Sequence, residues 1–272
     1  MPMWTWFGIR RGKVTTGWPD AAGPTGQDGV LGLPRLDASK CRAATTACTD
    51  CVAACPSEAI VARPGEGVGL DYARCVGCQI CTEICPEAAF GATHDWAFGV
   101  RSRDDLQTFG GDAGNVAESG REAQHARELV GFGKSLHIRH VDAGSCNGCE
   151  SELTALLNPF YNLHRLGIFF TPSPRFADLL LVTGPVSAAM REPLLRTWEA
   201  MPQPRWVMAL GTCATGGGTN GGGYSCHNGL EGLLPVDIWL PGCPPNPAAI
   251  IEALLLLLQR RPQRVHGGRH ES

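Results

Sequence analysis

The chain has 272 residues, of which 43% are hydrophobic, and a formal net charge of −3. This length suits about two domains with buried cores, and the near-neutral charge gives no electrostatic reason to bind nucleic acid. The longest apolar run, Ala248–Leu258, is interrupted by Glu252 and is shorter than the ~18 residues that a membrane-spanning helix needs. No apolar segment follows Arg10–Arg11, so we expect no secretory or twin-arginine signal. Thirteen cysteines in a cytoplasmic chain then indicate metal binding rather than disulfides.

The N-terminal part of the chain, 1–33, is rich in Gly, Pro and Trp, and we interpret it as an extension that becomes ordered only against a partner. The next part of the chain, residues 34–95, contains eight cysteines in two copies of one motif. The second copy, which ends at Cys85-Pro86, has the spacing C-x2-C-x2-C-x3-C-P of a bacterial two-cluster ferredoxin. We expect its last cysteine to lie at the start of a helix, with the proline at the first helical position.

This spacing predicts how the eight cysteines divide between two [4Fe-4S] clusters. Three cysteines in one tight loop reach three irons of a cubane, while the fourth points to the other cluster. The predicted ligands of one cluster are Cys75, Cys78, Cys81 and Cys55, and those of the other are Cys41, Cys48, Cys51 and Cys85.

The first copy departs from the motif, because six residues separate Cys41 from Cys48 where two are usual. A surface loop tolerates this insertion, since the entropy of closing a loop rises slowly with its length. Two interpretations stay open: Cys41 is a ligand, or this cluster has three irons or an altered potential. Zinc is the alternative metal for the whole region, because paired C-x2-C motifs also form structural zinc sites. The Cys-Pro that ends each copy favours the ferredoxin type.

Residues 96–134 form a predicted linker with many Gly and charged residues, one short helix around Glu118–Leu129 and a solvated His125. The following residues, 135–262, alternate strands and helices, which indicates a parallel sheet covered on both faces; residues 263–272 are a tail. The expected strands are Leu136–Val141, Gly167–Thr171, Asp178–Thr183, Trp206–Leu210 and Val236–Leu240. The expected helices are Glu150–Leu157, Ala188–Met201 and Ala248–Arg260.

The last helix has a clear predicted start, with Asn246 as the N-cap and Pro247 at the first helical position. It is apolar on nearly all sides, so we expect it to be buried against the sheet and a second surface.

Four further cysteines follow three of the expected strands. Cys146 and Cys149 follow the first strand, Cys213 the fourth and Cys243 the fifth. Because the carboxyl ends of parallel strands share one edge of a sheet, these thiols are expected to converge and to hold a third [4Fe-4S] cluster. Four thiolates also suit zinc, although a single C-x2-C pair with two isolated cysteines is less typical of a zinc ribbon.

Three other residues near these cysteines have two interpretations each. Cys226 is the thirteenth cysteine, and it is either a packed free thiol, which we favour, or a substitute ligand together with His227. Glu150 and Glu152 lie in the first turn of a helix, where they either complement the helix dipole or relay protons beside a redox centre. The glycine run 216–223 lacks the Lys-Ser/Thr of a phosphate-binding loop and is expected to let backbone approach a cluster.

Three segments carry a resemblance to a known family. The first is 141–195, which contains CNGCESE; the second is MALGTCATGGG; and the third is PVDIWLPGCPPNPAAI. Together they resemble the small subunit of group 4, membrane-bound [NiFe] hydrogenases, including the formate hydrogenlyase type, and the related 20 kDa subunit of complex I. The resemblance covers roughly 135–259. Complex I subunits have two adjacent cysteines where this chain has Cys146-Asn-Gly-Cys149, so the spaced pair favours the hydrogenase branch. The part from about Leu33 to Thr93 resembles the polyferredoxin subunit of the same complexes, usually a separate chain.

The resemblance implies an α+β ferredoxin-like two-cluster domain fused to an α/β flavodoxin-like domain with a parallel sheet. It implies that the proximal [4Fe-4S] cluster, on Cys146, Cys149, Cys213 and Cys243, lies beside the Ni–Fe site of a partner large subunit. Membrane antiporter-like and anchor subunits are implied as well, with the chain peripheral on the cytoplasmic side of the inner membrane. The implied electron donor is a ferredoxin, a formate dehydrogenase or a CO dehydrogenase. The chain lacks the C-x2-C pairs at both ends with which the large subunit binds nickel, so it is not expected to hold nickel itself.

Two alternatives to a hydrogenase subunit stay open. The first is a subunit of a nickel-free, complex I-like quinone or sulfur-reducing oxidoreductase, whose partner is a large subunit like that of complex I. The second is a zinc-stabilised structural protein.

Overall fold

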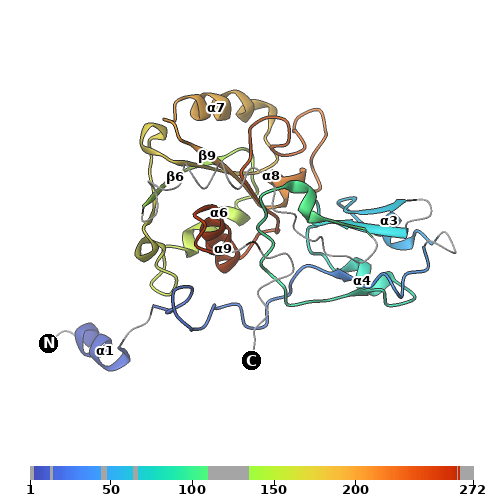
Figure 1. Ribbon diagram of the computed structural model, residues 1–272, viewed down its shortest axis with the longest axis horizontal. Coiled ribbons are helices and arrows are strands. Elements are labelled where there is room, and N and C mark those ends of the chain that lie inside the picture. Colours follow the sequence, from blue (N-terminus) through green and yellow to red (C-terminus); the bar gives the residue numbers. More distant parts are fainter. Residues whose placement is uncertain are drawn as a thin grey trace.

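The computed structural model describes residues 3–12, 15–43, 48–63, 67–109, 135–261 and 263. A small module carries the helices α3 (Asp50–Ala54) and α4 (Ile80–Ile84), and a larger α/β domain lies beside it (Figure 1). These are the ferredoxin-like and flavodoxin-like parts that the sequence predicts. In the described part of the chain, no helix is long and apolar enough to span a bilayer.

The small module combines two short antiparallel sheets with its two helices. One sheet pairs β1 with β4, and the other has the order β2-β3-β5. The strands are β1 (Arg35–Leu36), β2 (Ile60–Arg63), β3 (Gly67–Asp71), β4 (Phe90–Gly91) and β5 (Gln107–Phe109), and a 3-10 helix, η1 (Arg103–Leu106), precedes β5.

The internal repeat of the sequence is also a repeat of structure. The last cysteine of each copy is the C-cap of its helix, with φ −76° and ψ 111° at Cys55 and φ −73° and ψ 112° at Cys85. The expectation that these cysteines start a helix is therefore wrong. The following prolines, Pro56 and Pro86, explain the difference, because a residue before proline is restricted to extended backbone and a helix cannot continue through it.

The α/β domain contains one five-stranded parallel sheet with the order β10-β9-β8-β6-β7. Counted within this domain the order is 2-1-3-4-5, which is that of flavodoxin-like folds. All five predicted strands are confirmed, with ends that differ by at most two residues. The strands are β6 (Leu136–Asp142), β7 (Ile168–Phe170), β8 (Leu179–Thr183), β9 (Trp206–Leu210) and β10 (Ile238–Leu240).

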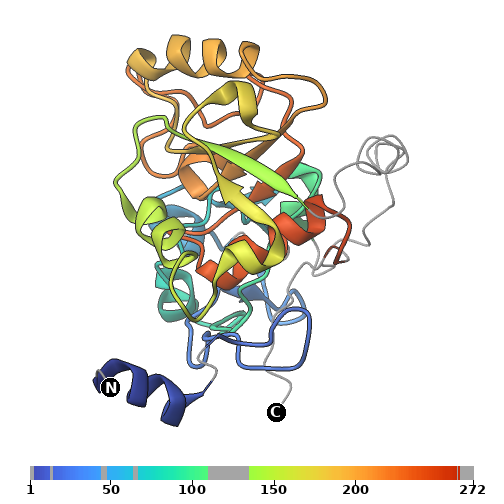
Figure 2. The same cartoon turned by 90° about the vertical axis from the view of Figure 1, so that its left-hand side faces the viewer.

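Helices cover both faces of this sheet. The helix α7 lies on one side, and α6 and α9 lie on the other (Figure 1); Figure 2 shows the orange α7 above the sheet and the red α9 below it. The domain's helices are α6 (Gly148–Ala155), α7 (Ala188–Glu199), α8 (Thr212–Gly216) and α9 (Pro247–Leu257), with 3-10 turns η2 (Leu163–Leu166) and η3 (Pro174–Phe176).

The last helix, α9, starts and packs as predicted. The Asn246 side chain accepts a hydrogen bond from the Ala249 N–H at 2.8 Å, and Pro247 is the first helical residue. Every residue of α9 is buried. Its second surface includes the segment between β4 and η1, because a Cβ placed on Gly99 would lie 3.0 Å from the Ala253 Cβ.

Part of the segment expected as a linker has regular structure. Val100 forms a β-bridge with Trp239, and β5 pairs with β3 of the small module. The aromatic and aliphatic residues of 96–100 explain this, since Trp96, Phe98 and Val100 are buried. The helix expected around Glu118–Leu129 lies outside the described residues.

The N-terminal extension packs on the chain itself over residues 15–33, first on the α/β domain and then, at residues 30–33, on the segment that follows β4. The expectation that this extension becomes ordered only against a partner is therefore wrong for these residues. Gln27 donates to the Tyr161 hydroxyl at 2.7 Å, and the Thr16 N–H donates to the Phe160 carbonyl at 3.0 Å. The helix α1 (Met3–Arg11) precedes this segment and stands away from the body of the molecule (Figure 1).

Candidate metal centres

The carboxyl edge of the parallel sheet brings together four of the predicted ligands, which we name the Cys149 group: Cys146, Cys149, Cys213 and Cys243. They belong to the loop after β6, the first turn of α6, α8 after β9, and the loop after β10. The pKa of the Cys149 thiol is raised. Burial is the main cause, and the charges of Glu150 and the three other thiols raise the pKa further. The convergence expected from the strand order is therefore present.

The loop that carries Cys146 has a defined turn. Asp142 ends β6, and its Oδ1 accepts hydrogen bonds from the Gly144 N–H at 2.8 Å and the Ser145 N–H at 2.7 Å. Gly144 has a φ of +105°, which favours glycine. This turn connects the end of β6 to the start of α6, and Cys146 and Cys149 follow it at the sheet edge.

Two glycines leave room around the thiols of the Cys149 group. A Cβ on Gly211 would lie 2.6 Å from the Cys149 sulfur, and one on Gly218 would lie 3.1 Å from the Cys213 sulfur. Both residues have a positive φ, of +89° and +59°. Side chains are thus excluded where the backbone approaches the sulfurs, as a bulky inorganic group with thiolate ligands requires.

The small module brings together two further groups of four thiols, in the division that the motif predicts. The Cys51 group consists of Cys41, Cys48, Cys51 and Cys85, and the Cys75 group consists of Cys55, Cys75, Cys78 and Cys81. Burial raises the pKa of the Cys51 thiol to about 11, and the charges of the other three members add to the rise. The pKa of Cys81 rises to about 12, first from burial and then from the three other thiols of its group. The charge of Cys41 is among those that raise the pKa of Cys51, so Cys41 lies near this group despite the insertion, and its role as a ligand stays a prediction.

Backbone N–H groups donate to one sulfur in each group of the small module. The Ala59 N–H donates to the Cys55 sulfur, and the Ala89 N–H donates to the Cys85 sulfur, both at 3.3 Å. Such bonds favour the thiolate over the thiol. They also tune the reduction potential of an iron–sulfur cluster.

The chemistry of these sites fits iron–sulfur clusters. Each group supplies four thiols and no imidazole, and at least one thiol of each is buried or half-buried, where uncompensated thiolates would repel one another. A zinc ion instead needs all its ligands about 2.3 Å from one point. The described residues contain no group of three or more His, Cys, Asp or Glu side chains that could hold a single metal ion.

The two candidate acids of α6 have different surroundings. Glu150 accepts hydrogen bonds from the hydroxyls of Ser145, at 2.7 Å, and Thr183, and its Oε1 lies 3.5 Å from the His140 Nε2. Glu152 is half-buried, and burial raises the pKa of its carboxyl. Glu150 therefore fastens the first turn of α6 to the ends of β6 and β8.

Sequence reasoning missed His140 and Thr183 as neighbours of this site. The His140 Nε2 lies 3.0 Å from the Thr183 hydroxyl, and burial lowers the pKa of the imidazole while Glu150 opposes that shift. The sequence carried little signal: Thr183 is the one polar residue of β8, but His140 is one of four polar residues in β6, and both lie close to the carboxyl ends of their strands.

The thirteenth cysteine lies near the Cys149 group without being one of its four thiols. Cys226 forms a β-bridge with Ser187, and its sulfur lies 3.7 Å from the Ser225 hydroxyl. Its charge is the weakest of the influences on the pKa of Cys213.

Comparisons with known proteins agree with this geometry. Residues 146–257 match the model of the "NADH ubiquinone oxidoreductase, 20 Kd subunit" family, and residues 44–90 match a 4Fe-4S dicluster domain. The protein named probable membrane-bound hydrogenase subunit mbhJ of Pyrococcus furiosus is 39% identical over 154 residues, which are 56% of this chain and 92% of that protein. The chain belongs to this family of NADH ubiquinone oxidoreductase subunits. It is an iron–sulfur electron-transfer subunit of an oxidoreductase complex.

Two further relatives of this family member are similar over part of their length. Formate hydrogenlyase subunit 7 of Escherichia coli is 42% identical over 133 residues, or 49% of this chain, and this chain spans only 52% of it. One chain in a solved structure of a membrane-bound sulfane sulfur reductase, an archaeal respiratory membrane complex, is 33% identical in sequence. The match covers 52% of this chain and 75% of the chain in that structure, with a TM-score of 0.42. In this family member the 4Fe-4S dicluster domain precedes the family domain.

Proposed function

We propose that this chain is the electron-transfer subunit of a membrane-associated [NiFe] hydrogenase. The observation that carries the proposal is the Cys149 group, in which three separate loops bring four thiols to one sheet edge. The spaced pair Cys146 and Cys149, together with relatives named as hydrogenase and formate hydrogenlyase subunits, supports the nickel-containing branch.

The three thiol groups would each hold one [4Fe-4S] cluster, so that twelve of the thirteen cysteines are ligands. Each cluster, when bound, supplies a site that accepts and releases one electron at a time. The chain supplies the environment: its loops and helix ends fix the ligand positions, Ala59 and Ala89 donate N–H bonds to ligand sulfurs, and Gly211 lets the backbone approach.

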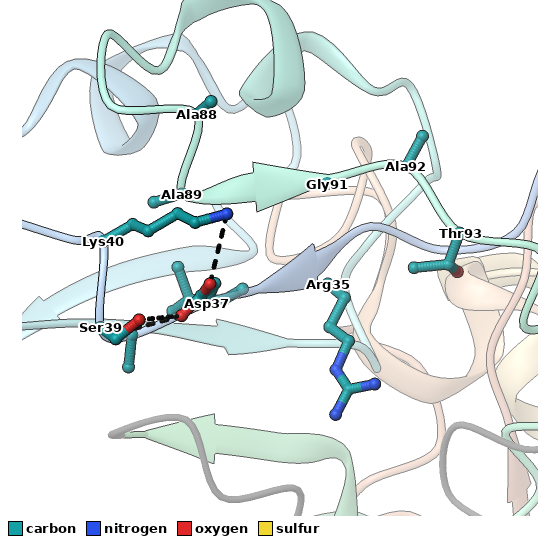
Figure 3. Close-up of a pocket in the computed structure, with 11 residues that line it drawn as sticks. Arg35, Asp37, Ser39, Lys40, Ala88, Ala89, Gly91, Ala92 and Thr93 are labelled. Atoms are coloured by element: carbon teal, nitrogen blue, oxygen red, sulfur yellow. Dashed lines mark hydrogen bonds and ion pairs between the residues drawn. The ribbon is translucent and has the colours of Figure 1, made fainter.

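The electron donor would dock beside the Cys51 group, where a pocket of about 580 Å³ opens on the surface (Figure 3). One wall includes the exposed side chains Arg35 and Lys40; Lys40 pairs with Asp37 at 3.4 Å, whereas the Arg35 side chain points away from that pair. The opposite wall includes Ala89, whose N–H donates to the Cys85 sulfur. A carrier with an acidic surface, such as a ferredoxin, suits this pocket because Arg35 and Lys40 attract it.

The remaining partners follow from the same proposal. A large subunit with the Ni–Fe site would cover the sheet edge, where Cys146 and Cys243 are exposed. Membrane subunits would hold the chain at the cytoplasmic side of the inner membrane. The helix α1 offers apolar surface for them, since Met3 and Ile9 are 78% and 70% exposed.

The proposal is tested on the anaerobically purified chain and on the complex that co-purifies with it. Three clusters predict about twelve irons and as many acid-labile sulfides per chain. A hydrogenase predicts hydrogen-dependent reduction of a viologen dye and C-x2-C pairs near both ends of the co-purifying large subunit. Twelve irons with a large subunit that lacks those pairs would instead select a nickel-free, complex I-like enzyme. Zinc without sulfide would select a structural protein.

A further inference from the structure

Residues 15–33, which we name the strap, run across both modules of the molecule. Figure 1 shows this blue segment passing beneath the α/β domain toward α4. In its first part, Gln27 donates a hydrogen bond to the Tyr161 hydroxyl of the α/β domain at 2.7 Å. Near its end, the Gly32 N–H donates to the Thr93 carbonyl at 2.8 Å. Because the strap is bonded at both ends, its last residues have a defined place beside the small module.

The end of the strap lies against both neighbours of Cys78. The Gln79 side-chain amide donates to the Gly32 carbonyl at 2.8 Å. A Cβ placed on Gly77 would lie 3.5 Å from the Leu33 Cδ2, so the leucine side chain lies next to that glycine. Cys78 is the one exposed member of the Cys75 group. The strap therefore supports the loop of the least buried ligand that we predict for this group.

The Gly32 carbonyl is a fixed acceptor. A Cβ placed on Gly32 would lie 2.2 Å from the Asp95 carbonyl oxygen and 2.7 Å from the Asp95 nitrogen, so no side chain fits there. The Thr93 hydroxyl donates to the carbonyl of the next strap residue, Leu33, at 2.7 Å. Bonds on both sides of the glycine thus hold its carbonyl where the Gln79 amide reaches it.

Gln79 has a backbone conformation that favours glycine. It is the N-cap of α4, with a φ of +63° and a ψ of 6°, which is the left-handed region. Its carbonyl accepts hydrogen bonds from the Thr82 N–H at 3.0 Å and the Thr82 hydroxyl at 2.7 Å, and any residue type could supply that carbonyl. The amide that bonds the strap is the one contact here that a glycine would lack.

The first copy of the motif differs at this position. Thr49 corresponds to Gln79, because each lies two residues before the third cysteine of its copy. Thr49 is exposed, has a φ of −131° and does not cap α3 with its side chain. The two otherwise similar thiol groups of the small module therefore offer an internal comparison, in which the contact between Gln79 and the strap belongs to the Cys75 group.

We propose that the strap holds the Cys78 loop in place and that Gln79 is the positioning residue through which it does so. The proposal rests on the proposed electron-transfer function and adds that retention of the Cys75-group cluster depends on a docked strap. Groups that orient metal ligands from behind are important for metal retention, and their loss weakens it about 10–100-fold. Cys78 is exposed, so the backbone on either side of it fixes its position.

Gln79→Met tests the proposal, because it keeps the length of the side chain and removes the amide donor. In the full chain loaded with iron and sulfide, we expect a chelator to remove the Cys75-group cluster at least about tenfold faster. The electron paramagnetic resonance signal of that cluster should also change shape, while the signal of the Cys51 group stays the same. Thr49→Met is the matched control in the first copy, and it should retain both clusters. Equal rates of cluster loss in the two variants would overturn the proposal.

Gln79→Gly separates the side chain from the backbone conformation. Glycine suits the left-handed region but cannot bond the strap, so this variant should lose the Cys75-group cluster as fast as Gln79→Met. A Gln79→Gly chain that retains its cluster like the unsubstituted chain would mean that the conformation alone matters, and the proposal would be wrong.

Gly32→Ala cuts the same contact from the side of the strap. We expect it to reproduce the rate of cluster loss and the spectrum of Gln79→Met. Gly29→Ala is the control within the strap, because a Cβ on Gly29 has nothing within 4 Å, and it should leave the Cys75-group signal unchanged. The double variant of Gly32→Ala and Gln79→Met should lose the cluster no faster than either single variant, since both remove one contact. A multiplied rate would contradict the shared contact.

Amide hydrogen exchange separates failure of this proposal from failure of the proposed function, since it needs no cluster. In Gln79→Met the amides of residues 76–79 should exchange about tenfold faster than in the unsubstituted chain. A chain with about twelve irons and unchanged exchange there would overturn the role of the strap and leave the electron-transfer function in place. A chain without sulfide but with the faster exchange would overturn the proposed function and leave the positioning role of Gln79 in place.

Discussion

The two modules of this protein collect their thiols in opposite ways. The small module takes eight from two copies of one short motif, so that most members of a group are neighbours in sequence. The α/β domain takes four from three loops, and only the order of the strands brings them together. The first kind of site is a property of local sequence, whereas the second is a property of the whole fold, so the two should differ in how they respond to substitution.

The largest expected effect is that of Cys213→Ser, which removes the ligand contributed by α8. We expect the loss of about four of about twelve irons, because the other three ligands of the Cys149 group, which come from two further segments, cannot hold the cluster alone. Hydrogen turnover of the complex should be abolished, while the two clusters of the small module stay reducible by dithionite. Retained turnover would contradict the assignment of Cys213 as a ligand.

Gly211→Ala tests whether the Cys149 group depends on the fold around it. The added Cβ would lie 2.6 Å from the Cys149 sulfur at a φ of +89°, so we expect loss of the same cluster although no ligand is removed. Gly232→Ala is the matched control, because Gly232 has a φ of +73° and nothing within 4 Å of the added Cβ. That control should lower the free energy of unfolding by about 1–2 kcal/mol and keep its iron. Equal iron contents in the two variants would show that the glycine is not required by the site.

Arg103→Leu removes a side chain that pairs with Asp71 of the small module and bonds the Thr215 carbonyl of the α/β domain. It leaves Asp71, whose side chain is 11% exposed, without its cationic partner, so we expect the free energy of unfolding to fall by about 3 kcal/mol at pH 7. Burial already raises the pKa of Asp71 above 3.8, and the loss of Arg103 raises it further. A carboxyl with a raised pKa in the folded state favours folding below its unfolded pKa and disfavours it as pH rises. The deficit should therefore shrink as the pH falls toward 4.

The control for this experiment is Arg196→Leu, which breaks an exposed pair with Glu192 at 2.8 Å. Both side chains of this pair are more than half exposed, and such an ion pair stabilises a protein by less than about 1 kcal/mol, because water screens the two charges. Denaturant titrations of both variants at pH 7 and pH 5 measure the difference. If the loss in the free energy of unfolding of Arg103→Leu did not depend on pH, the Asp71 carboxylate would not be its cause.

The sequence predicted the sheet well because apolar runs report burial directly. Trp206–Leu210 was predicted to the residue, and the N-cap at Asn246 was identified from its own side chain and the following proline. The contacts that join the modules were out of reach. Thr212 and Arg103 are polar residues without a motif, and their partners across the junction between the modules, Cys75 and Thr215, are distant in sequence. Pairing of β5 with β3 was hidden in a segment whose composition resembles a linker.

Cys41→Ser sharpens the comparison within the small module. Cys41 lies near Cys51 in spite of the insertion, since its charge is the largest thiol contribution to the raised pKa of Cys51, and we predict that it is a ligand of this group. We expect the variant to lose about one iron and to show the signal of a three-iron cluster, since the other three thiols stay in place. Cys75→Ser should act on the other cluster alone. A Cys41→Ser chain with an unchanged spectrum would mean that Cys41 is not a ligand.

The smallest expected effect is that of Cys226→Ser. Cys226 lies near the Cys149 group, but it is the one cysteine that we assign to none of the three groups. Its neighbour in space is the Ser225 hydroxyl, and its charge is the last of the influences on Cys213. Iron content, sulfide content and the signal of the Cys149 group should all match those of the unsubstituted chain. A loss of iron in this variant would mean that Cys226, and not one of the four thiols of the Cys149 group, is a ligand. Cys146 and Cys243 are both exposed, so Cys146→Ser and Cys243→Ser would then be measured first. The nil result has weight because Cys213→Ser, measured in the same way, should lose a whole cluster.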